Sequence, residues 1–176
     1  MTTNTDVYTT DFYAWCLSTA TLVREGQWDE IDAEALAEEL ESLGRSQKRA
    51  LESRMEGLVM HLLKWAHQPD RRHDSHSWYD TIREHRNEIA RLLRDTPSLK
   101  PQVAPILEEV YPEAHAWALG EMTSYAWEKQ RRTTFREPRS FDRELDLEAF
   151  GIVGPLPPQC PWTVGQILDN DFWPGL

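Results

Sequence analysis

Three histidines and two aspartates lie close together in a short polar stretch of the sequence. They are His67, Asp70, His73, Asp74 and His76. Imidazole and carboxylate groups at such short spacing can bind zinc or another transition metal. The spacing matches neither the His-Glu-x-x-His motif of zinc enzymes nor the Glu-x-x-His motif of di-iron bundles. His67, His73 and His76 are therefore candidate metal ligands, and an exposed loop without a metal is the favoured alternative.

Two further histidines lie at or near the apolar faces of predicted helices. His61 is close to the apolar face of a long helix, and His85 belongs to the apolar face of the helix that follows. A histidine in such a place is more often a hydrogen-bonded core residue than a catalytic base. We therefore expect both to be structural.

Nucleophilic and carboxylate chemistry find little support in the sequence. Cys16 stands among apolar residues at helical spacing, and Cys160 has no histidine near it in sequence. The chain has no Gly-x-Ser-x-Gly, no glycine-rich phosphate loop and no dinucleotide fingerprint. Glu34, Glu38 and Glu41 recur as a solvated helix face would. No catalytic residue and no cofactor site is predicted.

One apolar stripe organises the chain from Asp32 to His67. Its members recur three or four residues apart, as on one face of an α-helix: Leu36, Leu40, Leu43, Gln47, Leu51, Met55, Leu58, Leu62 and Trp65. Asp32 suits the N-cap and Pro69 ends the element. The stripe keeps its phase across Gly44, which favours one continuous helix from about Ala33 to Ala66 over two helices with a hinge. At ~1.5 Å per residue it is on the order of 50 Å long, and other helices must pack on it.

Shorter helices are predicted before and after the long one. A first helix runs from about Tyr8 to Glu25, with Asp11 able to serve near its start, and ends at Gly26. Ser77 can cap a third helix that ends before Pro97. The face of this helix opposite its apolar residues carries Arg83, Arg86, Arg91 and Arg94. Because acids alternate with these arginines, a solvated face with ion pairs is favoured over a phosphate-binding stripe.

The last part of the chain is rich in prolines and less regular. Ser98 can cap a further helix, Pro105 should kink it and Pro112 can open another segment, so this region is one bent helix or two short ones. Residues 129–160 read as a mostly irregular connection, in which 143–150 could form a short helix. In residues 161–176, a capping box from Thr163 to Gln166 predicts a short helix that docks on the bundle.

The length and the cysteine content favour one soluble cytoplasmic domain. A chain of 176 residues can bury a sizeable core as a single domain, 1–176. Cys16 and Cys160 do not form a disulfide framework, no apolar run is long enough to cross a membrane, and residues 1–10 lack the pattern of a signal peptide. We therefore expect a reducing location and no membrane partner.

The charge is negative overall and unevenly distributed. The formal net charge of −11 makes nucleic acid an unlikely partner, since binding to it depends on basic residues that neutralise phosphates. Acids dominate from Asp29 to Glu41, whereas bases outnumber acids from Arg45 to Lys100. The 8 tryptophans suit an aromatic core, or alternatively an aromatic-lined pocket or partner surface.

Short runs spread over nearly the whole chain resemble a known bacterial family. These runs are Asp11–Trp15, Ala37–Gly44, His61–Trp65, Gln68–Pro69, Ser77–Trp78, Thr81–Ile82, Pro97–Lys100, Cys160–Thr163, Gln166–Asp169 and Phe172–Pro174. In this order they are similar to the family called domain of unknown function 29. The resemblance implies an all-helical fold. It implies no assigned activity and no catalytic residues.

The sequence therefore predicts an all-α fold, a mostly antiparallel helical bundle organised on one long central helix. The favoured function is a noncatalytic protein that binds another protein, or itself, because no catalytic motif is present and the charge distribution is two-signed. One alternative is a metal-dependent hydrolase or nuclease that uses His67, His73 and His76. A second alternative is a nucleic-acid-associated module that uses the basic residues of 45–100.

Overall fold

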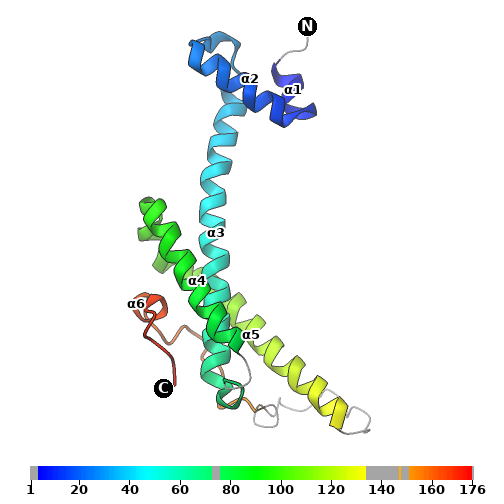
Figure 1. The fold of residues 1–176 in the computed structure, drawn as a ribbon, viewed down its shortest axis with the longest axis vertical. Coiled ribbons are helices and arrows are strands. Elements are labelled where there is room, and N and C mark those ends of the chain that lie inside the picture. Colours follow the sequence, from blue (N-terminus) through cyan, green and yellow to red (C-terminus); the bar gives the residue numbers. More distant parts are fainter. Residues whose placement is uncertain (1–3, 73–75, 134–146, 148–150, 176) are drawn as a thin grey trace. The chain divides into compact units, whose positions relative to one another are not determined.

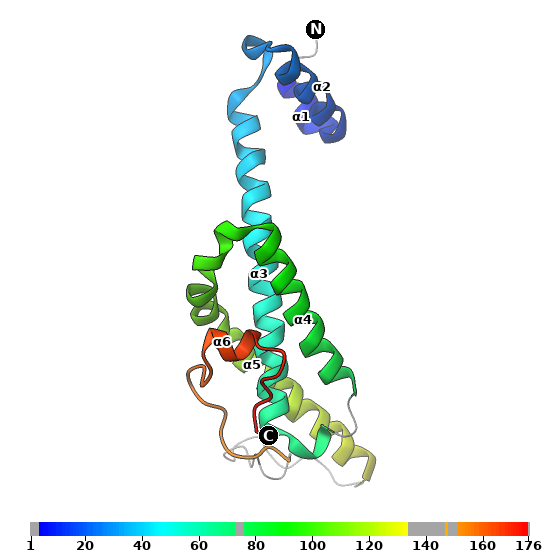
Figure 2. The ribbon, with the colours of Figure 1, turned by 60° about the vertical axis from the view of Figure 1, so that its left-hand side comes forward.

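The chain is all-α, as predicted, in a computed structural model that describes residues 4–72, 76–133, 147 and 151–175. No strand occurs among these described residues. The helices are α1 (Asn4–Thr10), α2 (Phe12–Glu25), α3 (Ala33–His67), α4 (His76–Asp95), α5 (Val103–Thr133) and α6 (Val164–Leu168), with 3-10 turns at Trp28–Glu30, Pro69–Arg71 and Pro97–Gln102. Figures 1 and 2 show these elements along the chain.

The helices form two compact units, residues 1–48 and residues 49–176. Helix α3 supplies its first part to the former, which we call the N-terminal unit, and its second part to the latter, the C-terminal unit. The single-domain organisation expected from the length stays a prediction.

In the N-terminal unit, α1 and α2 pack side by side (Figures 1 and 2). The single helix predicted from Tyr8 to Glu25 is wrong at Asp11, which separates the two. The carboxylate of Asp11 accepts a hydrogen bond from the backbone N–H of Ala14 at 3.0 Å, so Asp11 is the N-cap of α2 and has a non-helical conformation. The ring centroids of Tyr8 and Trp15 lie 4.9 Å apart, and Trp15 is buried between the helices of this unit. Gly26 ends α2 in the left-handed conformation, as predicted.

Helix α3 is continuous from Ala33 to His67, which confirms the prediction that Gly44 does not break it. Its start is capped as expected, because the Asp32 carboxylate accepts a hydrogen bond from the N–H of Ala35 at 3.1 Å. The second part of the predicted stripe is the centre of the C-terminal core, where Leu51, Met55, Leu58 and Leu62 are fully buried.

Helix α4 runs back along α3 in the C-terminal unit (Figures 1 and 2). Three contacts show that α4 runs antiparallel to α3, because the residue numbers on α4 decrease as those on α3 increase. They pair Arg54 with Glu88, Gly57 with His85 and Lys64 with Trp78. The helix begins at His76, so Ser77 lies inside it and is not the predicted N-cap.

Helix α5 runs unbroken from Val103 to Thr133, which decides between the two predictions for this region in favour of one helix. Pro105 occupies the first turn, where its missing N–H needs no intrahelical partner, and Pro112 lies inside the helix. The predicted irregular connection therefore begins later than Lys129. The helix proposed for 143–150 lies outside the described residues, apart from a turn at Leu147.

The last residues pack against α3 and α4. The predicted capping box is present, since Thr163 accepts from the N–H of Gln166 and the Gln166 side chain accepts from the N–H of Thr163. Ile167 is fully buried. The Trp173 ring lies 4.8 Å from that of Trp65 and 4.7 Å from that of Tyr79. Within the described part of the chain, no helix combines the length and the apolar character needed to cross a membrane.

One arginine of α4 lies where the sequence did not place it. Arg86 is 2% exposed, so the prediction of a fully solvated arginine face is wrong at this position. Its Nε donates to the carbonyl of Ile167 and its NH2 group to that of Phe172, both at 2.8 Å. Its guanidinium also lies over the Trp173 ring, 5.2 Å from the centroid. The C-terminal segment buries Arg86. The residue spacing within α4 could not predict this burial, because the residues that cover Arg86 are distant in sequence.

Candidate protein-interaction surface

The first part of the α3 stripe is exposed, although its second part is buried. Leu40 and Leu43 are 61% and 63% exposed, whereas Leu51 and Leu58 are 0% exposed. The prediction that other helices pack on the whole stripe is therefore wrong for Leu40 and Leu43. The N-terminal unit buries Ala35 instead, which lies on a different side of α3.

The rest of the N-terminal unit also exposes large apolar side chains. On α2 these are Phe12, Tyr13, Leu17 and Val23, and Trp28 is exposed in the turn that follows. Burial of a single leucine side chain is worth about 1.5–3 kcal/mol, so several large apolar side chains left exposed in one small unit are unfavourable in an isolated protein. Exposed apolar side chains in this number favour a surface that a partner covers.

The N-terminal unit is also strongly acidic in composition. The acids of the N-terminal unit are Asp6, Asp11, Glu25, Asp29, Glu30, Asp32, Glu34, Glu38, Glu39 and Glu41, whereas its bases are Arg24, Arg45 and Lys48. A field of one sign steers partners by charge and affects the association rate more than the affinity.

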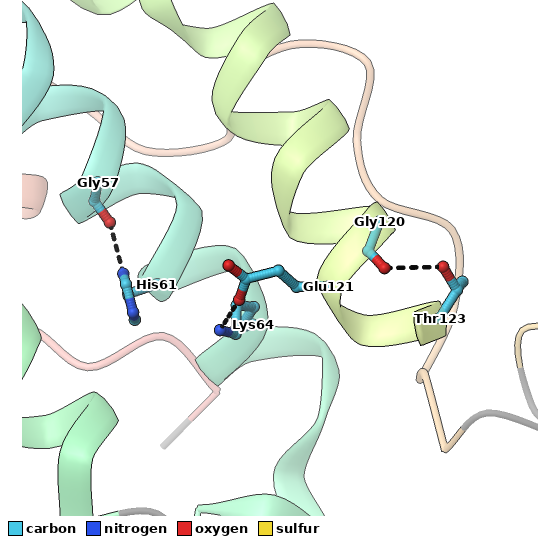
Figure 3. A network of polar contacts seen from close by, with 6 residues as sticks. All are labelled: Gly57, His61, Lys64, Gly120, Glu121 and Thr123. Carbon is cyan, nitrogen blue, oxygen red and sulfur yellow. Dashed lines mark hydrogen bonds and ion pairs between the residues drawn. The ribbon is translucent and has the colours of Figure 1, made fainter. Parts of the chain in front are cut away.

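A polar network in the C-terminal unit joins α3 to α5 (Figure 3). Lys64 is 6% exposed and forms an ion pair with Glu121 of α5. Its ammonium group also lies 4.9 Å from the centroid of the Trp78 ring. One turn earlier on α3, the Nδ1–H of His61 donates to the carbonyl of Gly57 at 2.8 Å. This bond confirms the prediction of a hydrogen-bonded structural histidine at position 61.

His85 lies against the same part of α3. Its ring centroid is 6.1 Å from that of His61, and its Nδ1 is buried without a hydrogen-bond partner among the described residues. Burial lowers the pKa of both histidines, and the adjacent His61 lowers that of His85 further. Both rings are therefore neutral at physiological pH.

These lowered pKa values predict that acid destabilises the C-terminal unit. The unfolded chain, with histidine pKa values near 6.5, binds more protons than the folded chain, so stability is full above pH 6.5 and falls as the pH drops below it. We expect the free energy of unfolding, measured with urea, to fall between about pH 7.5 and about pH 5.5. A variant with both His61→Gln and His85→Gln should lose less over this interval. An equal loss in the two proteins would contradict the assignment.

The candidate metal ligands are only partly placed by the structure. The Nδ1–H of His67 donates to the carbonyl of Val153 at 2.9 Å, and the N–H of Val153 donates to the His67 carbonyl at 2.8 Å. His73 and the side chain of His76 lie outside the described residues. Across the described residues, no group of three or more His, Cys, Asp or Glu is arranged to hold a metal ion. A metal site at His67, His73 and His76 stays a prediction.

Many bases of the segment 45–100 make contacts inside the chain. Arg54 pairs with Glu88 at 2.6 Å, and Arg72 donates from Nε to the carbonyl of Trp65 at 2.8 Å. Together with the buried Lys64 and Arg86, these contacts leave fewer basic groups to meet phosphates. They give no support to the nucleic-acid alternative.

The cysteines are not placed for nucleophilic chemistry. Cys16 and Cys160 are both partly buried thiols. Burial raises the pKa of Cys160, whose Sγ donates to the carbonyl of Trp162 at 3.4 Å. A raised pKa keeps the thiol protonated and unreactive at neutral pH.

The family follows from a comparison over almost the whole chain. The model of the family "Domain of unknown function DUF29" matches residues 7–173. The chain belongs to this family. No curated protein and no solved structure matches it.

The DUF29 match includes both compact units. The exposed part of the α3 stripe and the network of His61, Lys64 and Glu121 therefore both belong to the DUF29 domain. The sequence pattern identified Leu40 and Leu43 as members of the stripe but did not predict that they are exposed. It missed the second feature, because the partners of Lys64 are distant in sequence, on α4 and α5.

Proposed function

We propose that this DUF29 chain is a noncatalytic protein-interaction protein that binds a partner protein through the exposed part of the α3 stripe. The observation that supports this is the contrast along one continuous stripe, which is fully buried at Leu51 and Leu58 and exposed at Leu40 and Leu43. The proposed partner presents an apolar helix that covers Leu40 and Leu43. A bacterial, cytoplasmic location is part of the proposal, and the unpaired Cys16 and Cys160 suit it.

The chemistry of the described residues also suits a noncatalytic role. The Nδ1–H of His61 donates to the carbonyl of Gly57, one turn earlier in α3, and Lys64 forms an ion pair with Glu121 of α5. Both interactions stabilise the packing of α3, and neither needs a substrate to explain it. Leu40 and Leu43, in contrast, leave 61% and 63% of their surface exposed within their own unit.

Affinity capture from the native cells tests the proposal. The tagged full chain is compared with a Leu40→Gln, Leu43→Gln variant, after nuclease treatment and at physiological salt. Leucine and glutamine have similar helix propensities, so α3 should stay folded in the variant. We expect a stoichiometric partner, or an untagged second copy, with the native chain and its loss with the variant.

The matched control is Val153→Gln in the C-terminal unit. Val153 is 62% exposed, as the two leucines are, but lies outside the stripe. The control should capture the same partner as the native chain. Capture that is the same for all three proteins would contradict the proposed surface.

A further inference from the structure

Residues 169–175, which follow α6, are held by α3 and α4 in the way that a protein holds a peptide ligand. They form no helix. Arg86 of α4 donates from NH2 to the carbonyl of Phe172 at 2.8 Å. Arg72, which follows α3, donates from NH1 to the carbonyl of Gly175 at 3.0 Å. Because every peptide presents such carbonyls, these charge-assisted bonds hold the backbone whatever its side chains are.

The side chain that distinguishes this segment is Trp173. Its ring stacks on Tyr79 of α4 with an interplanar angle of 11°, and its centroid lies 4.8 Å from that of Trp65 of α3. The guanidinium of Arg86 lies 5.2 Å from the centroid of the same ring. We call Trp65, Tyr79 and Arg86, together with Arg72, the Trp173 site.

The two residues after Trp173 restrict the ligand further. Pro174 is buried. Gly175 has a φ of 76°, in the left-handed region, and a Cβ there would lie 2.7 Å from NH2 of Arg72. The sequence that fits the Trp173 site is therefore tryptophan, proline and glycine in this order.

Helices α3 and α4 contact each other directly beside the Trp173 site. The ammonium of Lys64, which precedes Trp65, lies 4.9 Å from the ring centroid of Trp78, which precedes Tyr79. The segment 169–175 does not contribute to this contact. The two helices therefore bring the aromatic residues of the site together by contacts of their own.

The segment leaves two buried donors of the Trp173 site unused. NH1 of Arg86 and Nε1 of Trp65 have no hydrogen-bond partner among the described residues. Arg86 is 2% exposed and Trp65 is 8% exposed, so both side chains are removed from solvent. A buried donor without an acceptor lowers stability. Residues 169–175 therefore satisfy the site only in part, which favours their exchange for another peptide.

We propose that the Trp173 site is a binding site for peptides with the sequence tryptophan, proline and glycine. The chain's own residues 169–175 fill it, and a peptide of the same chemistry from outside the chain enters it by displacing them. The site belongs to the C-terminal unit, so this inference goes beyond the proposed function and does not depend on Leu40 and Leu43.

A fluorescently labelled synthetic peptide with the sequence of residues 169–175 tests the inference on the full chain. The Trp173→Ala chain holds its own segment less tightly, so we expect it to bind the peptide with a dissociation constant below about 1 mM, measured by fluorescence anisotropy. Binding to the native chain should be roughly tenfold weaker, because its attached segment competes at an effective concentration in about the millimolar range. The Trp117→Ala chain should bind as the native chain does.

The matched control peptide carries the Trp173→Ala substitution and should bind to none of these chains. Tyr79→Ala, added to the Trp173→Ala chain, should weaken binding of the native peptide roughly fivefold, because a stacking partner is lost. Tyr79 is 39% exposed, so the helix should tolerate this substitution. Absence of binding to the Trp173→Ala chain, or equal binding of the two peptides, would overturn the inference.

Hydrogen exchange on the native chain is a second measurement, which does not require the Trp173→Ala chain to fold. The N–H of Phe172 donates to the carbonyl of Asp169 at 3.2 Å within the segment. At several times its dissociation constant, the native peptide should make this amide exchange several-fold faster, because displacement opens the segment. The control peptide should leave the rate unchanged. A rate that the native peptide also leaves unchanged would overturn the displacement.

Discussion

Replacement of Trp173 by alanine should lower the free energy of unfolding by about 3 kcal/mol, a typical loss for truncation of a packed tryptophan. The Trp173 ring stacks on Tyr79 with an interplanar angle of 11° and contacts Trp65 of α3. It also lies under the guanidinium of the buried Arg86. These contacts join the last residues of the chain to α3 and α4, so their loss should also loosen the C-terminal segment. Denaturant unfolding followed by circular dichroism measures the change.

The matched control is Trp117→Ala on α5. Trp117 is 56% exposed, and substitutions at such positions usually change stability by less than about 0.5 kcal/mol. Hydrogen exchange should show faster exchange of the Ile167 and Phe172 amides in Trp173→Ala and native rates in Trp117→Ala. Equal losses of stability in the two variants would contradict the anchoring role of Trp173.

Gly57→Ala should destabilise the C-terminal unit by about 2 kcal/mol, the scale of an overpacked core. A Cβ at this position would lie 2.6 Å from Nε2 and 2.9 Å from Cε1 of His85, so the ring of His85 or the whole of α4 must shift. In the absence of that contact, the same substitution would stabilise a helix by about 1 kcal/mol. The expected sign is therefore opposite to that of helix propensity, and thermal or urea unfolding reports it.

Gly120→Ala on α5 is the matched control, because a Cβ there meets nothing within 4 Å. It should be neutral or stabilising by up to about 1 kcal/mol. A His85→Ala substitution should relieve the cost of Gly57→Ala, so that the double variant is more stable than the sum of the single effects predicts. Additive effects would mean that Gly57 and His85 are not in contact.

Local signals predicted most of the helices and several of their caps. The caps expected at Ser77 and Ser98 are wrong, because α4 already begins at His76 and Ser98 lies inside the 3-10 turn before α5. The phase of the leucine stripe across Gly44 predicted one continuous α3, and Asp32, Gly26 and the Thr163 capping box are where the sequence placed them. Such signals depend on residues a few positions apart, so the sequence contains them directly. The sequence placed Asp11 near the start of the first helix, where it is the N-cap of α2. It did not predict a separate α1 before Asp11, because the apolar spacing continues across this residue.

Features that depend on distant partners could not be predicted in the same way. Arg86 follows the pattern of a solvated face, and only the carbonyls of Ile167 and Phe172 explain its burial. The leucine stripe predicted contact along its whole length, but spacing alone does not say which part has a neighbour. The exposure of Leu40 and Leu43, on which the proposed function depends, was therefore available only from the structure.

Site-specific photocrosslinking in living cells tests the protein-interaction proposal most directly. A photoreactive amino acid replaces either Gln47, which is exposed on the side of α3 that carries Leu40 and Leu43, or Arg45, which is exposed on the opposite side. The proposal predicts a discrete crosslinked protein from position 47 and none from position 45. No product from position 47, or the same products from both positions, would contradict it.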